Sequence, residues 1–205
     1  MNIPLDVEVH CTDGAGGHSL ALVLNPVTQV ATHLVVKNKG HDHAGHLLPL
    51  QLITGATAKS IAVSCTRDEL GRLDPFEKMV RSEETGLGGV SAQALAGAEF
   101  HSGLGFQDFG TIEGSEPAYI EVEAIPEADL AVRHGIPVEA TDGTVGKVDE
   151  FTLNPQTGKI TFLVLKEGHL LKHDVPVPVD QIDRFGEETV FLKLTKAGVE
   201  QLPHE

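Results

Sequence analysis

The chain contains one sequence unit written twice, and this repeat constrains the fold more than any other feature. Residues 11–73 and 140–202 align without a gap when the numbering is shifted by 129. The identical pairs include Val9 and Val138, Asp13 and Asp142, Gly17 and Gly146, Asn25 and Asn154, and Pro49 and Pro178. A repeat of this regularity predicts two copies of one folding unit, and each residue can be compared with its counterpart.

Each copy has the local signals of short strands joined by tight turns. Asp142-Gly143 and Asn154-Pro155 have turn chemistry, and the segments between them are rich in β-branched and alternating apolar residues. In the second copy we expect strands at 136–140, 147–153, 159–166, 175–179 and 189–194. A short helix should close each copy, because Thr66 and Glu69 fit a capping box. Gly198 replaces Glu69 in the second copy, so that helix should be weaker.

These signals predict an all-β fold with minor α content. Five or six short strands in a unit of about 70 residues favour a small closed or nearly closed β-barrel. One unit of this size buries little core and is marginally stable alone. We therefore expect two small β-barrels in tandem, packed on each other with pseudo-two-fold symmetry.

Charge and composition divide the chain into three regions. We expect a first domain at 1–80, an acidic Gly-rich connector at 81–132 that is partly flexible, and a second domain at 133–205. The connector carries ten acidic residues and one basic residue, whereas the whole chain has a net charge of −15. Such a chain does not neutralise phosphates, so we expect no binding to nucleic acid.

The N-terminal region and the hydropathy pattern bear on location. No apolar run approaches the roughly 20 residues that cross a bilayer. The first residues lack the charged and apolar regions of a secretory signal. We therefore expect a cytoplasmic protein without membrane insertion.

Three stretches of the second copy carry a family resemblance. Residues 135–151 include Thr141-Asp142-Gly143, residues 154–164 begin with Asn154-Pro155, and residues 174–182 contain two prolines between valines. Together they resemble the PRC-barrel domain, which occurs in the photosynthetic reaction-centre H subunit, in a ribosome maturation factor and in stand-alone bacterial and archaeal proteins. The resemblance implies a tandem PRC-barrel protein. Members of this family act mostly as non-catalytic adaptors.

This resemblance implies a function class but no partner. We expect a non-catalytic scaffold that mediates assembly with another protein, and not an enzyme. A second copy of the chain, giving a homodimer, is one candidate partner. The family also suggests an alternative, a soluble accessory factor of a photosynthetic or respiratory membrane complex. A shared fold hosts many functions, so these expectations rest on analogy.

Histidines in the two long loops suggest a different function. The candidate ligands are His41, His43 and His46 in the first copy and His169 and His173 in the second. Imidazoles at such spacing can converge on Zn or Ni, which would make the chain a metal-binding or metal-responsive protein. The simpler interpretation is a solvated polar loop in each copy, and it is favoured because the positions do not match between copies. No other cofactor is expected.

The connector contains the remaining candidate binding residues. Phe100, Phe106 and Phe109 are aromatic residues in an otherwise polar, Gly-rich stretch. They either anchor the connector onto the domains or form a short recognition element for a partner. Outside the strands of the two copies, polar and apolar residues alternate in 119–123 as they do in an edge strand.

Isolated nucleophiles do not form a catalytic set. Cys11 and Cys65 stand opposite Ala140 and Leu194, so we expect two buried, inert thiols. Ser19 lies in a sequence loosely similar to a hydrolase nucleophile elbow, but it begins a strand instead of following one. A structural role is therefore expected for all three.

Overall fold

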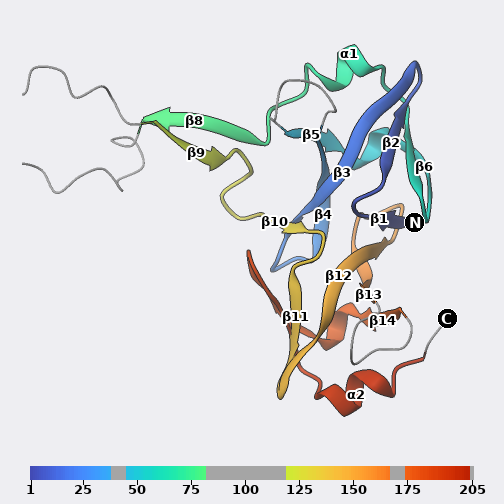
Figure 1. The fold of residues 1–205 in the computed structure, drawn as a ribbon, viewed down its shortest axis with the longest axis vertical. Coiled ribbons are helices and arrows are strands. Elements are labelled where there is room, and N and C mark those ends of the chain that lie inside the picture. Colours follow the sequence, from blue (N-terminus) through green and yellow to red (C-terminus); the bar gives the residue numbers. More distant parts are fainter. Residues whose placement is uncertain (38–44, 82–118, 167–173, 204–205) are drawn as a thin grey trace, which may run out of the picture. The chain divides into compact units, whose positions relative to one another are not determined.

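The computed structural model describes residues 1–37, 45–81, 119–166 and 174–203 of the chain. These residues form two compact units, one of Met1–Phe76 with Ala124–Glu205 and one of Glu77–Glu123. The described residues are mostly β-strand, in two seven-stranded sheets and one two-stranded sheet, with two short helices (Figure 1). The prediction of a mostly β fold with minor α content is confirmed.

The first repeat forms one sheet in the order β5-β4-β3-β2-β7-β6. Neighbouring strands are antiparallel except β2 and β7, which are parallel. The strands are β2 (Glu8–Cys11), β3 (Gly14–Asn25), β4 (Val30–Lys37), β5 (Gly45–Pro49), β6 (Ile53–Thr57) and β7 (Ser60–Val63), with the 3-10 turn η1 (Leu50–Leu52) before β6.

The second repeat forms a sheet of the same order, β14-β13-β12-β11-β16-β15. Its elements are β11 (Pro137–Ala140), β12 (Gly143–Leu153), β13 (Ile160–Lys166), β14 (Val175–Pro178), β15 (Ile182–Phe185) and β16 (Val190–Leu192), with η2 (Val179–Gln181). Even the irregularities repeat. The register shifts after Val9 in β2 and after Val138 in β11, which are counterparts at the 129 offset. The two copies therefore share backbone detail as well as topology.

Each repeat contributes a strand to the sheet of the other. β1 (Asn2–Pro4) pairs with β12, and β10 (Leu130–Arg133) pairs with β3, both antiparallel. Ile3 lies opposite Phe151, and Val132 lies opposite Leu22. These two pairs are counterparts of each other, so the exchange is reciprocal. The two repeats are consequently joined by backbone hydrogen bonds as well as by side chains.

The β3–β4 and β12–β13 turns also meet. The Ala31 amide donates to the Gly158 carbonyl at 3.0 Å, and the Ile160 amide donates to the Gln29 carbonyl at 2.9 Å. These bonds are again counterparts, which is the relation that pseudo-two-fold packing requires. One continuous buried core runs through both repeats, and its fully buried members include Ile3, Leu22, Leu34, Ile61, Val132, Phe151, Leu163 and Val190.

The turns and caps follow from their residue types. Asn25 Oδ1 accepts from the amides of Val27 and Thr28, as an Asx-type turn requires. Gly143 has φ +124°, a conformation that side chains with a Cβ rarely adopt. Asp13 and Asp142 each accept a hydrogen bond from the first amide of the helix that closes their repeat, from Arg67 at 2.9 Å and from Lys196 at 2.7 Å.

The two predicted helices are present. α1 (Arg67–Leu70) has the predicted capping box, in which Thr66 Oγ1 accepts from the Glu69 amide and the Glu69 carboxylate accepts from the Thr66 amide. α2 (Lys196–Glu200) keeps the Thr195 cap, while Gly198 offers no carboxylate in return. The second helix therefore has one capping bond where the first has two.

The second unit contains an antiparallel pair, β8 (Glu77–Arg81) and β9 (Tyr119–Glu123). The predicted strand at 119–123 is confirmed. The stretch expected to be connector thus includes β9 and also β10, which belongs to the sheet of the first repeat.

Candidate functional site

The predicted metal ligands fall mainly outside the described residues. His41, His43, His169 and His173 are among the undescribed positions. His46 is described on β5, where its Nδ1 lies 3.2 Å from the Leu73 carbonyl oxygen. No group of three or more His, Cys, Asp or Glu side chains with metal-binding geometry occurs among the residues that the structure describes.

The predicted partner-binding aromatics also lie outside the described residues. Phe100, Phe106 and Phe109 fall within 82–118. The aromatic side chains that the structure does describe include Phe76 and Phe162, and a comparison of the two repeats makes both informative.

In the first repeat, the outer face of the sheet is covered by Phe76. The ring is fully buried, and it packs in a small cluster separate from the main core. The face beneath is apolar throughout and consists of Ala21 and Val23 on β3, Val35 on β4, Leu47 on β5 and Ala131 on β10. Burying a phenylalanine on such a face contributes about 1.5–3 kcal/mol by area.

Backbone bonds hold the Phe76 segment against the edge of β5. The Phe76 amide donates to the Gly45 carbonyl at 2.7 Å, and the Leu47 amide donates to the Asp74 carbonyl at 2.9 Å. The guanidinium of Arg133 lies 5.1 Å from the centre of the Phe76 ring, within cation–π range. The segment thus joins the edge of the sheet through one antiparallel bridge, between Pro75 and His46.

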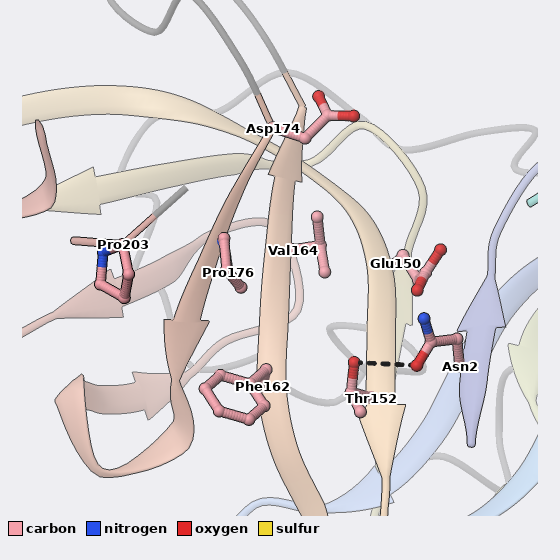
Figure 2. A pocket seen from close by; sticks show the side chains of 8 residues that line it. All are labelled: Asn2, Glu150, Thr152, Phe162, Val164, Asp174, Pro176 and Pro203. Carbon is pink, nitrogen blue, oxygen red and sulfur yellow. Dashed lines mark hydrogen bonds between the residues drawn. The ribbon is translucent and has the colours of Figure 1, made fainter. Parts of the chain in front are cut away.

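The equivalent face of the second repeat is an open groove. Its volume is about 540 Å3, within the range of ligand sites. The described residues that line it are Asn2 from β1, Glu150 and Thr152 from β12, Phe162 and Val164 from β13, Pro176 from β14, and Asp174 and Pro203 (Figure 2).

Position by position, the groove replaces apolar residues with polar ones. Glu150 stands where the first repeat has Ala21, Thr152 where it has Val23, and Asn2 where it has Ala131. The Thr152 hydroxyl donates to Asn2 Oδ1 at 3.3 Å. The position equivalent to Phe76 is Glu205, which lies outside the described residues.

The groove has an acidic end and an apolar end. Glu150 and Pro176 lie on either side of Val164, and Asp174 lies beyond Val164 at one end of the groove. Phe162 lies at the other end, opposite Thr152 (Figure 2). Phe162 is 39% exposed and is one of the two large hydrophobic side chains, with Val27, that are exposed among the described residues. Partial burial raises the pKa of the Glu150 carboxyl, and the charges of Asp149 and Asp174 raise it further. Like charges are therefore crowded at one end of an apolar surface.

The edge of β14 differs from the edge of β5 in a way that matters for binding. Pro176 occupies the position of Leu47, and proline has no amide hydrogen to donate. Asp174 occupies the position of Gly45, where a Cβ would lie 2.9 Å from Val35 Cγ1 and 3.4 Å from Phe76 Cβ. A segment seated like Asp74–Phe76 would lose one backbone bond here and meet the Asp174 side chain.

A charged cluster adjoins the acidic end of the groove. His134 Nε2 lies 3.1 Å from Asp149 Oδ1, and Lys166 Nζ lies 3.2 Å from the same oxygen. A smaller hollow of about 280 Å3 lies beside it, lined by residues that include Asp6, His134, Asp149 and Glu150. Asp149 thereby contacts both the His134 ring and the Lys166 ammonium group.

The surroundings of Ser19, Cys11 and Cys65 indicate structural roles. Ser19 is buried, its hydroxyl lies 3.1 Å from the Pro4 carbonyl oxygen, and it accepts from the Val7 amide at 3.1 Å. Cys11 and Cys65 are buried and unbridged, as expected. Burial raises the pKa of the Cys11 thiol to about 11, and the adjacent Cys65 raises it further.

Comparisons with known proteins add no identification. No protein-family model matches this chain, and no curated protein matches it. Within the described residues, neither helix has the length and apolar character needed to span a membrane.

Proposed function

We propose that this chain is a non-catalytic protein-interaction module built of two PRC-type barrels, and that the second repeat presents the binding surface. The sequence of 135–182 supports the family assignment, because it carries the three stretches typical of PRC-barrel domains. The cytoplasm is the proposed location.

One observation supports the interaction role above the others. The same sheet face is closed by Phe76 in the first repeat and forms an open groove in the second. At this face the second repeat has the partly exposed Phe162 where the first has His33, and polar residues where the first is apolar. Aromatic residues are enriched at protein-binding surfaces, and a groove that combines apolar side chains with a few polar groups suits such a role.

The test is affinity purification of the tagged full-length protein from its own cells, read by quantitative mass spectrometry. We expect one protein at near-equal abundance with the wild type. Phe162→Glu should lose it, because the substitution puts a charge at the apolar end of the groove. Val27→Glu is the matched control, since Val27 is the other large hydrophobic side chain found exposed among the described residues, at 88%, and it lies outside the groove.

Three outcomes separate the alternatives. Loss with Phe162→Glu and retention with Val27→Glu supports the proposal. A partner retained by both variants would place the interaction elsewhere on the chain and contradict the groove as its surface. No enriched protein at all would contradict the scaffold role and favour metal analysis of the histidine loops.

A further inference from the structure

The groove of the second repeat has features that define the chemistry of its occupant. The nature of this occupant rests on the proposed interaction function and specifies its partner. Three properties carry it: the charge at one end, the apolar surface at the other, and the backbone chemistry of the edge.

Charge excludes one class of occupant and favours another. Among the described residues that line the groove, two are carboxylic acids and none is basic. A second copy of this chain would bring a further net charge of −15, and a nucleic acid would bring phosphates, so both would be repelled. A cationic group is attracted, and it relieves the crowding of Glu150 with Asp149 and Asp174.

Edge chemistry weakens recognition by strand addition in the manner of the first repeat. Pro176 offers no amide to a neighbouring strand, so one of the two backbone bonds is lost, and the Asp174 side chain stands where Gly45 lets the Phe76 segment approach. An occupant therefore depends mainly on its side chains, inserted over Val164 and against Phe162.

We propose that the groove binds a basic protein segment through an arginine side chain with an apolar residue beside it. The guanidinium lies between the carboxylates of Glu150 and Asp174, and the apolar side chain lies against Phe162, Pro176 and Pro203. Arginine fits better than lysine, because its planar fork of donors can bridge two carboxylates and is weakly hydrated. The two ends of the groove thus require two neighbouring side chains, one positively charged and one apolar.

The experiment is an NMR titration of the full-length protein with a short capped peptide that has Arg and Leu adjacent in a Gly/Ser background. We expect saturable shifts of Val164, Thr152 and Phe162, and none of Val23 or Val35, which occupy the same face in the first repeat beneath Phe76. The peptide with citrulline for Arg should bind at least about tenfold more weakly, because citrulline keeps the shape and removes the charge. Raising the salt concentration should weaken binding severalfold.

Substitutions test the assignment of each end. Glu150→Gln should weaken binding about fivefold, whereas Glu187→Gln, in the exposed β15–β16 turn, should leave it unchanged. Phe162→Ala should weaken binding of the Arg-Leu peptide and not of a peptide with Gly for Leu. Unchanged amide spectra elsewhere will show that each variant folds.

The outcomes distinguish this inference from the function on which it rests. Equal binding of the arginine and citrulline peptides, or shifts outside the groove, would overturn the arginine assignment. If a cellular partner is nevertheless lost with Phe162→Glu, the interaction function stands with a different occupant chemistry. If the arginine peptide binds the groove but the cellular partner is retained by Phe162→Glu, the groove is not the surface that binds this partner, and if no cellular partner is enriched at all, the scaffold role is wrong.

Discussion

Val30 forms an antiparallel bridge with Lys159, the residue at the same position of the other repeat. When a residue pairs with its own counterpart, the local two-fold axis passes between the two residues, and here it passes between the β3–β4 and β12–β13 turns. The exchanged strands β1 and β10 and the reciprocal amide bonds of Ala31 and Ile160 are arranged about this axis. The two repeats are therefore halves of one structure.

The first prediction concerns cooperativity. Ile3 is fully buried in β1 and packs in the shared core, so Ile3→Ala should destabilise the protein by about 2–4 kcal/mol. Because β1 pairs with β12, hydrogen exchange should accelerate in the second repeat as much as in the first. Urea unfolding followed at both repeats should give one shared transition. Two separate transitions, with only the first displaced, would show that the repeats fold independently.

The second prediction compares two phenylalanines on equivalent faces. Phe76→Ala removes a fully buried ring and should cost about 3–5 kcal/mol. Phe162→Ala removes a ring that is 39% exposed and should cost about 1 kcal/mol or less. Chemical denaturation of both variants measures the difference. Equal costs would mean that the groove is covered in solution.

The third prediction concerns the close approach at Gly45. A Cβ there would lie 2.9 Å from Val35 Cγ1 and 3.4 Å from Phe76 Cβ, so Gly45→Ala should destabilise by about 1–3 kcal/mol. Gly55 in β6 is the control, because a Cβ at that position meets nothing within 4 Å. Gly55→Ala should leave the melting temperature unchanged or raise it slightly. A neutral Gly45→Ala would show that the Phe76 segment is free to move away.

The local elements of this fold were predictable from sequence, because turn residues and alternation act over a few positions. Asp142-Gly143 predicted a turn and the Thr66 capping box predicted a helix, and the alignment of the repeats predicted the same elements in the other copy. β1 and β10 were not predicted. Each has only three or four residues, too few for a clear alternation, and each is a strand because a partner in the other repeat pairs with it.

The groove was also missed, although the offset alignment contains a signal for it. Glu150 and Thr152 replace Ala21 and Val23, and these changes can be read directly from the sequence. Which face of the sheet they occupy cannot be read, because the register of β12 shifts between Val148 and Glu150. A bulge of this kind resets the inward and outward alternation, so the side chains after it cannot be assigned to a face without the structure.

The fourth prediction concerns thiol reactivity. The pKa of Cys11 is raised from 9.0 to about 11, chiefly by burial and further by Cys65, so the thiol stays protonated at neutral pH. Cys11 should react with a thiol reagent at least about 100-fold more slowly in the native protein than in urea. Because its pKa is higher in the folded state, the protonated Cys11 thiol contributes to the free energy of unfolding. This contribution is complete below pH 9 and is lost as the pH rises toward 11. Rapid labelling of Cys11 in the native state would contradict its burial.

The last prediction concerns Glu150 and links the groove to stability. Burial, Asp149 and Asp174 raise the pKa of Glu150 above its ordinary value of 4.5, so the folded state binds its proton more tightly than the unfolded state. The contribution to stability is therefore complete below that value and is lost as the pH rises through the raised folded-state pKa.

Glu150→Gln has no carboxyl at this position, so its stability does not fall in this way as the pH rises. The variant should be more stable than the wild type at pH 7, by no more than about 1 kcal/mol because the carboxyl is only partly buried. The advantage should vanish below about pH 4, where the wild-type carboxyl is protonated in both states. Asp183→Asn, at an exposed position of β15, is the control and should give no such pH-dependent gain. Thermal melts from pH 4 to pH 8 measure both. If Glu150→Gln is instead less stable than the wild type at neutral pH, the carboxylate makes a stabilising contact in the folded protein. The idea that this charge lowers stability and is kept for binding would then be wrong.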